Sequence, residues 1–118
     1  MSLTVVVLCA AWCKTCREFE PVVDRVAAAR AGMRFVWCDV EDDSNVCGDI
    51  DVENFPTLAI FRGDEVLHFG VSLPHERTFA RLVDEMAEPA RAALQDVSDE
   101  LRALAQAVRS MPSAGGHS

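Results

Sequence analysis

The feature that most constrains the fold is an apolar stretch that leads into a pair of cysteines and then into a helix. Residues 3–9 (LTVVVLC) are continuously apolar and rich in β-branched side chains, which is typical of a strand covered on both faces. Apolar residues then recur at helical spacing over residues 14–31, and residues 33–40 (MRFVWCDV) predict a second strand. A strand, a helix of this length and another strand form a βαβ unit, in which the strands are parallel and the crossover is right-handed.

The second half of the chain predicts a hairpin and a further helix. Residues 57–62 and 65–70 are short strand-like segments joined by Gly63-Asp64, which is typical of a tight turn. Residues 72–75 supply a hydroxyl cap and a proline for a helix, and the apolar side chains of that helix share one face. The sequence therefore predicts an α/β fold, with a mixed sheet flanked by helices.

A separate apolar pattern follows near the C-terminus. Its residues are spaced alternately three and four apart: Leu94, Val97, Leu101, Leu104, Val108 and Met111. The pattern lasts under three heptads and its flanks carry almost no charge, which favours a helix that packs on its own domain; a dimer or partner surface is the alternative. We divide the chain into a domain at residues 1–88, an additional C-terminal helix at 89–111 and a disordered tail at 112–118.

Composition narrows the possible functions. Half of the 118 residues are apolar, and the net charge of −8 argues against nucleic acid or an anionic membrane as a partner. No basic residues precede the first apolar run, and that run is too short to span a bilayer, so we interpret it as a buried strand rather than a targeting signal. Five cysteines are an odd number, which disfavours a fully paired secreted scaffold. We expect a cytoplasmic protein.

The position of the cysteine pair between a strand and a helix indicates its chemistry. Cys13 and Cys16 fall where the first strand ends and the helix begins, and the unpaired N–H groups and positive dipole of a helix N-terminus favour a thiolate at Cys13. Lys14 adds positive charge. The spacing brings the two sulfurs close enough to form a disulfide, so that Cys13 can attack a substrate disulfide and Cys16 can resolve the mixed disulfide. Without this context, a CxxC sequence fits zinc binding equally well.

Several segments together resemble the thioredoxin family. They are Ala11-Trp12-Cys13-Lys14-Thr15-Cys16, Pro21 in the helix, Asp39 at the end of the second strand, and Phe55-Pro56-Thr57 before the hairpin. The resemblance extends over about residues 3–87. It implies a thioredoxin-like fold and a protein thiol–disulfide oxidoreductase, whose redox group is a Cys13–Cys16 disulfide with no added cofactor.

The resemblance also implies roles for other residues and partners. It makes Cys13 the nucleophile and Cys16 the resolving thiol, with Trp12, Lys14 and Thr15 in supporting positions. Phe55, Pro56 and Thr57 form the substrate-binding platform, and the peptide bond before Pro56 is expected to be cis. The implied partners are protein disulfides and a reductant of the thioredoxin-reductase type, with no nucleic acid or membrane. The protein is expected to be a monomer, or a weak homodimer through the C-terminal helix.

Three departures from the family pattern carry consequences. The family's usual first strand and helix are missing, so we expect a four-stranded sheet with residues 33–40 at one edge, and a C-terminal helix that shields this edge or its adjoining face. Val7 occupies the place of the usual buried aspartate, and Trp37 that of its accompanying lysine. Without that carboxylate Cys16 should hold its proton tightly, which predicts slow turnover. Lys14-Thr15 replaces the family's usual Gly-Pro.

Alternative functions remain open at this level. The chain can be a binding or adapter module with little turnover, or a thiol redox sensor that uses Cys47 or dimerisation. Cys9 and Cys38 end neighbouring strands and are expected to be buried, either near one another or as separate small apolar residues, and Cys47 is a candidate partner for Cys38. Zinc would need two of these three in addition to the dithiol, and no second CxxC exists, so we predict no metal site. Seven acids and no base between Asp39 and Glu53 indicate a solvated surface, or alternatively one that steers basic partners.

Overall fold

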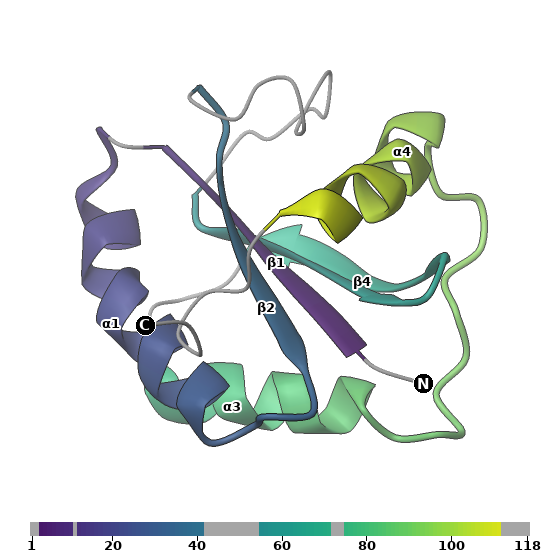
Figure 1. Ribbon diagram of the computed structural model, residues 1–118, viewed down its shortest axis with the longest axis horizontal. Helices are drawn as coiled ribbons and strands as arrows, with labels where there is room; N and C mark the ends of the chain where they lie inside the picture. Colours follow the sequence, from purple (N-terminus) through teal and green to yellow (C-terminus); the bar gives the residue numbers. More distant parts are fainter. Residues whose placement is uncertain (1–2, 11, 42–54, 72–74, 112–118) are drawn as a thin grey trace.

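The computed structural model describes residues 3–10, 12–41, 55–71 and 75–111. Its elements are β1 (Leu3–Cys9), α1 (Lys14–Ala28), β2 (Arg34–Asp39), β3 (Thr57–Arg62), β4 (Glu65–Val71), α3 (Glu76–Met86), α4 (Asp99–Ala107) and the short 3₁₀ helix η1 (Val108–Ser110). Within these residues the strands form one sheet in the order β2-β1-β3-β4 (Figure 1). β1 and β2 are parallel, and the other two pairs are antiparallel. The predicted four-stranded mixed sheet, with the second strand at an edge, is confirmed.

The first face of the sheet is covered by α1 and α3. Alternate side chains of β1, among them Val5 and Val7, join a core cluster with the apolar faces of both helices. Phe19 of α1 lies edge-on to Phe79 of α3, with ring centroids 4.9 Å apart. The intervening residues of β1, Val6 and Leu8, point to the other face and are also buried. Burial on both faces explains why this strand is continuously apolar.

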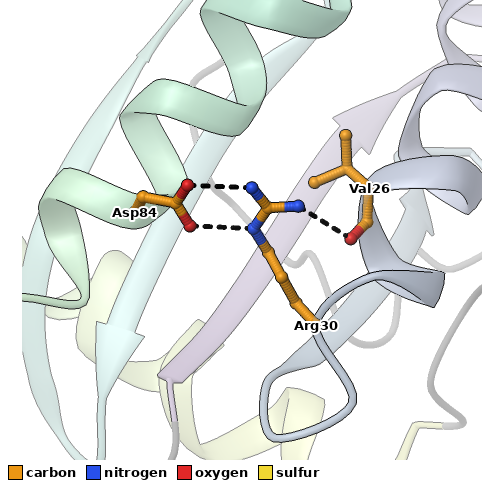
Figure 2. Close-up of polar contacts among 3 residues, drawn as sticks. All are labelled: Val26, Arg30 and Asp84. Carbon is orange, nitrogen blue, oxygen red and sulfur yellow. Dashed lines mark hydrogen bonds and ion pairs between the residues drawn. The ribbon is translucent and has the colours of Figure 1, made fainter.

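A bidentate ion pair fastens the two helices of this face to each other. Arg30, just after α1, donates from Nε and Nη2 to the two carboxylate oxygens of Asp84 in α3, each at 2.8 Å (Figure 2). Its remaining nitrogen donates to the backbone carbonyl of Val26 at 3.2 Å. The guanidinium of Arg30 holds the pKa of Asp84 below its usual range. The pair therefore fixes the end of α1 against α3 by geometry as well as by charge.

The second face is covered by α4, which lies away from α1 and α3 (Figure 1). Leu101, Leu104 and Val108 are buried against side chains from all four strands. Helix α4 therefore shields the sheet face that adjoins the edge strand β2, as we expected from the sequence. Among the described helices, none has the length and apolar character needed to cross a membrane.

Helix α4 covers only part of the range expected at 89–111. It starts at Asp99, where the Ser98 side chain accepts a hydrogen bond from the Leu101 N–H at 3.2 Å. Leu94 precedes the helix, and its N–H donates to the Val66 carbonyl at 2.7 Å. Residues before Ser98 thus run along the hairpin instead of extending the helix. The predicted tail at 112–118 lies outside the described residues.

Two helix boundaries also differ from the sequence expectation. Helix α1 ends at Ala28 rather than residue 31, because the Arg30 N–H turns back to the Ala27 carbonyl at 3.0 Å. The glycine with positive φ in the described residues is Gly63, in the β3–β4 turn. Helix α3 begins after His75 with no side-chain cap, and Ser72 lies outside the described residues.

Candidate dithiol site

Cys13 and Cys16 occupy the junction between β1 and α1. Cys13 is the N-cap of α1 in an extended conformation, and its N–H donates to the Ala10 carbonyl at 3.0 Å. This turn half-exposes Cys13 and directs Cys16, one turn into the helix, toward the core, where it is 1% exposed. Both are free thiols. The arrangement offers one sulfur to solvent at a helix N-terminus and keeps a second directly behind it.

The pKa of the Cys16 thiol is affected by burial and by its neighbours Cys9, Ala10 and Cys13. Burial raises the pKa of Cys16, as does its hydrogen bond to Cys13, whereas the bonds from Cys9 and Ala10 lower it. The net direction is upward. Cys16 therefore holds its proton tightly, as expected for a thiol in an apolar place without a neighbouring carboxylate.

Cys9 is the residue of this site that the sequence analysis did not assign. It is 1% exposed and shares a face of β1 with Val5 and Val7, so its side chain lies under α1 beside Cys16. Burial raises the pKa of the Cys9 thiol far above its ordinary value, and the hydrogen bond to Cys16 adds to the shift. The strand is continuously apolar, so the sequence held no alternation that could have assigned Cys9 to one face.

The expectation that Cys9 and Cys38 could be neighbours is wrong. Cys9 pairs in register with Asp39 and belongs to the α1 side of the sheet, whereas Cys38 pairs with Leu8 and belongs to the α4 side. Cys38 therefore pairs with the residue before Cys9, and two adjacent positions of a strand point to opposite faces. Cys38 is disulfide-bonded. Cys47 lies outside the described residues.

Aromatic and apolar side chains from a distant segment border the dithiol. Trp12 is 65% exposed, and its ring meets that of Phe55 edge-on, with centroids 5.6 Å apart. The Phe55–Pro56 peptide bond is cis, and Thr57 is buried. Thr57 pairs with Leu8 because β3 runs antiparallel to β1, so the start of β3 lies beside the end of β1. The topology thus brings the Phe55–Thr57 segment to the cysteines.

The remaining predicted site residues lie at the periphery. Lys14 is exposed and Thr15 is half-buried in the first turn of α1. Position 7 carries a valine rather than an acid, and this valine is fully buried. Trp37 packs, partly buried, against the same core. Asp39, at the end of β2, accepts a hydrogen bond from the Glu41 N–H at 2.8 Å. In the part of the chain that the structure describes, no three His, Cys, Asp or Glu side chains are arranged to hold a metal ion.

Comparison with known proteins assigns the family. The family model described as Thioredoxin matches residues 1–88 of this chain. The chain belongs to the thioredoxin family.

Individual thioredoxins match more distantly. The chain is 32% identical over 78 residues to the chloroplastic M-type thioredoxin of Zea mays, covering 64% of this chain and 46% of that protein. It is 30% identical over 81 residues to an H-type thioredoxin of Brassica campestris, covering 69% of this chain and 66% of that protein. The crystal structure of the thioredoxin NaTrxh of Nicotiana alata superimposes with a TM-score of 0.65 at 25% identity, over 74% of this chain and 75% of that one. The chain thus spans about half the length of the maize thioredoxin and 66% of the Brassica one.

Proposed function

We propose that this thioredoxin-family chain reduces disulfides in proteins by using Cys13 and Cys16 as a redox-active pair. The observation that carries the proposal is the relation between the two thiols. Cys13 is half-exposed at the N-terminus of α1, and Cys16 is buried in the first turn of the same helix. The sulfur of Cys13 can therefore attack a substrate disulfide, and the sulfur of Cys16 can then attack the mixed disulfide at Cys13.

The reaction consists of two thiol–disulfide exchanges. The thiolate of Cys13 attacks one sulfur of the substrate disulfide, forms a mixed disulfide and releases the other substrate sulfur as a thiolate, which takes up a proton. Cys16 then loses its proton and attacks the sulfur of Cys13, which frees the second substrate thiol and leaves a Cys13–Cys16 disulfide. Two electrons from an external dithiol reductant, of the kind that a thioredoxin reductase supplies, restore the pair.

The rim formed by Trp12, Phe55 and Pro56 supports a role in holding the substrate chain. Trp12 and Phe55 present apolar ring surface next to Cys13, and Lys14 and Thr15 complete the approach to the first turn. An extended segment that carries a disulfide can lie across this surface. We place this activity in a reducing compartment such as the cytoplasm, and the two exchanges use the Cys13–Cys16 pair without an added cofactor.

A disulfide-reduction assay tests the proposal. Dithiothreitol and a disulfide-linked model protein are incubated with the wild-type chain, Cys13→Ser, Cys16→Ser and, as a control at a cysteine outside the CxxC sequence, Cys47→Ser. We expect turnover by the wild type and by Cys47→Ser, and a loss to the uncatalysed rate in both dithiol variants.

Two outcomes overturn the proposal. One is activity that survives in Cys13→Ser, which removes the nucleophile. The other is a wild-type chain that binds the model protein without accelerating its reduction, which assigns the same surface to an adapter. Loss of activity in Cys47→Ser alone points instead to the redox-sensor alternative.

A further inference from the structure

A pocket of about 300 Å³ lies between the β3–β4 turn and α4, at the end of the sheet opposite the dithiol. Thr57, at the start of β3, pairs with Leu8 close to the cysteines, whereas Arg62, at the end of β3, pairs with Leu3 at the far end of β1. The turn that follows Arg62 is therefore remote from Cys13. The pocket and the dithiol are separate sites on the same chain.

The pocket forms because the chain before α4 runs back along the hairpin (Figure 1). The Leu94 N–H donates to the Val66 carbonyl at 2.7 Å. The guanidinium of Arg62 donates to the carbonyls of Pro89 and Arg91, at 3.4 and 2.9 Å. These bonds hold this stretch beside β4, so that the hairpin, the stretch itself and α4 enclose the pocket from three sides.

The floor of the pocket is apolar. Val66 is buried, Ala93 and Val97 are half-buried, and Leu94 is 46% exposed. Leu94 lines the pocket and belongs to neither core cluster of the sheet. Its large aliphatic side chain therefore presents apolar surface that the protein itself leaves open.

The charge of the pocket comes from Arg102 in α4. Asp64 and Glu65 also line the pocket, but Asp64 is paired with Arg109 and Glu65 with Arg62. Arg102 forms no ion pair and no side-chain hydrogen bond with the residues that the structure describes. One unpaired positive charge thus stands beside an apolar floor.

We propose that this pocket binds the C-terminal end of a partner polypeptide whose last residue is aliphatic. The aliphatic side chain packs on Leu94 and Val97, and the terminal carboxylate accepts hydrogen bonds from the guanidinium of Arg102, whose planar donors match a carboxylate. Gln106, one turn farther along the same face of α4, donates from its amide to the same carboxylate. The site goes beyond the proposed function, because it uses neither cysteine of the dithiol.

The size and the charge of the pocket favour this occupant. Sites for whole small molecules have volumes of about 300–1,000 Å³, so this pocket has room for one side chain and its carboxylate rather than for a large cofactor. Because Leu94 stays partly exposed, the pocket opens to solvent and the rest of the partner chain can leave it. A chain end without a negative charge would leave Arg102 unpaired, and a cationic one would be repelled.

An NMR titration of the isotope-labelled protein tests the proposal. The probes are an acetylated Gly-Ser-Gly-Ser-Leu peptide with a free carboxylate, the same peptide as a C-terminal amide, the same peptide with lysine as its last residue, and hexanoate. We expect saturable shifts of the backbone amides of Val66, Leu94 and Arg102 with the free-carboxylate leucine peptide. The amide and the lysine peptide should bind at least tenfold more weakly, and hexanoate more weakly than the leucine peptide.

Single substitutions assign the contacts. Arg102→Gln should weaken binding of the leucine peptide about tenfold, because hydrogen bonds between two charged groups are lost. Leu94→Ser should also weaken it, since the variant loses apolar floor but keeps the N–H that bonds to Val66. Arg77→Gln is the matched control: it removes an exposed arginine from α3, on the other face of the sheet, and should bind as the wild type does. All three replace exposed side chains, and their amide spectra report whether they fold.

Three results overturn the proposal. They are the absence of saturable shifts around the pocket in the wild type, equal binding of the free-carboxylate and amide peptides, and wild-type affinity in Arg102→Gln. Hexanoate that binds as tightly as the leucine peptide overturns the assignment to a polypeptide and indicates a site for free aliphatic acids. Disulfide reduction is measured separately on the same variants: a chain that binds the peptide but fails to reduce disulfides overturns the proposed function and leaves the pocket standing.

Discussion

At Cys16, the surroundings of one thiol act on its pKa in both directions. Burial, the largest cause, and Cys13 raise the pKa of Cys16, whereas Cys9 and the backbone of Ala10 lower it. A resolving thiol benefits from both, because it must stay neutral while Cys13 attacks and must ionise once the mixed disulfide has formed. We therefore expect resolution by Cys16, rather than attack by Cys13, to limit turnover.

Asp84 carries the first stability prediction. Asp84→Asn breaks the bidentate pair with Arg30 and should lower the free energy of unfolding at pH 7 by about 0.5–1 kcal/mol, the upper range for an ion pair with a half-exposed partner. Because folding lowers the pKa of Asp84, its contribution is present above the unfolded-state value of about 3.9 and disappears as the pH falls through the folded-state value. Urea denaturation at pH 7 and near pH 2 should show the gap between wild type and variant closing in acid.

The neighbouring exposed pair supplies a control for this prediction. Glu85 lies 3.7 Å from Arg81 on the outer surface of α3, and both side chains are more than half exposed. Glu85→Gln should change the unfolding free energy by less than Asp84→Asn. Equal stability of the Asp84→Asn variant and wild type at pH 7, or a gap that persists in acid, would show that the ion pair is not what fastens α1 to α3.

At the scale of elements, α4 is the addition that distinguishes this chain. Leu104 is 1% exposed, between α4 and the sheet. Leu104→Ala should destabilise the protein by about 2–5 kcal/mol, because it removes buried apolar surface and leaves a cavity. Gln106→Ala, on the exposed side of the same helix, should change stability by less than about 0.5 kcal/mol. Thermal and urea unfolding measure both variants, and equal small effects would mean that α4 is not an integral layer of the fold.

The elements also show how far sequence reasoning reaches. Strands and helices were predictable where the apolar pattern was strong, as in the continuous run at residues 3–9 and in the hairpin, and the cysteine pair was predictable from its position between a strand and a helix. The start of α4 was not, because Leu94 and Val97 continue the apolar spacing although Leu94 bonds to the hairpin instead. Tertiary contacts settle such boundaries.

The site shows a similar division. Cys13 and Cys16 stand out by their spacing, and Phe55-Pro56 by a known pattern. Cys9 gives no such signal, since a cysteine at the end of an apolar strand also fits the core. Its contact with Cys16 depends on how α1 lies across the sheet, and the face occupied by Cys38 depends on strand register. Neither can be read from residue types alone.

The whole molecule is a three-layer arrangement, in which α1 and α3 cover one face of the sheet and α4 covers the other (Figure 1). The apolar residues Leu101, Leu104 and Val108 are buried within this arrangement, so α4 offers them to no second copy. We therefore expect a monomer with a mass near 12.9 kDa across a wide concentration range in light scattering coupled to size exclusion. A dimer that dissociates when Leu101 or Leu104 is replaced would instead support association through α4.

The central claim is that Cys13 attacks and Cys16 resolves, and trapping the mixed disulfide tests it most directly. The Cys16→Ser variant is incubated with a disulfide-linked peptide, and intact mass followed by peptide mapping locates the attached peptide. The account predicts a stable adduct on Cys13 in Cys16→Ser, none in Cys13→Ser, and in the wild type a Cys13–Cys16 disulfide with the peptide released. An adduct on another cysteine, or no adduct in Cys16→Ser, would contradict it.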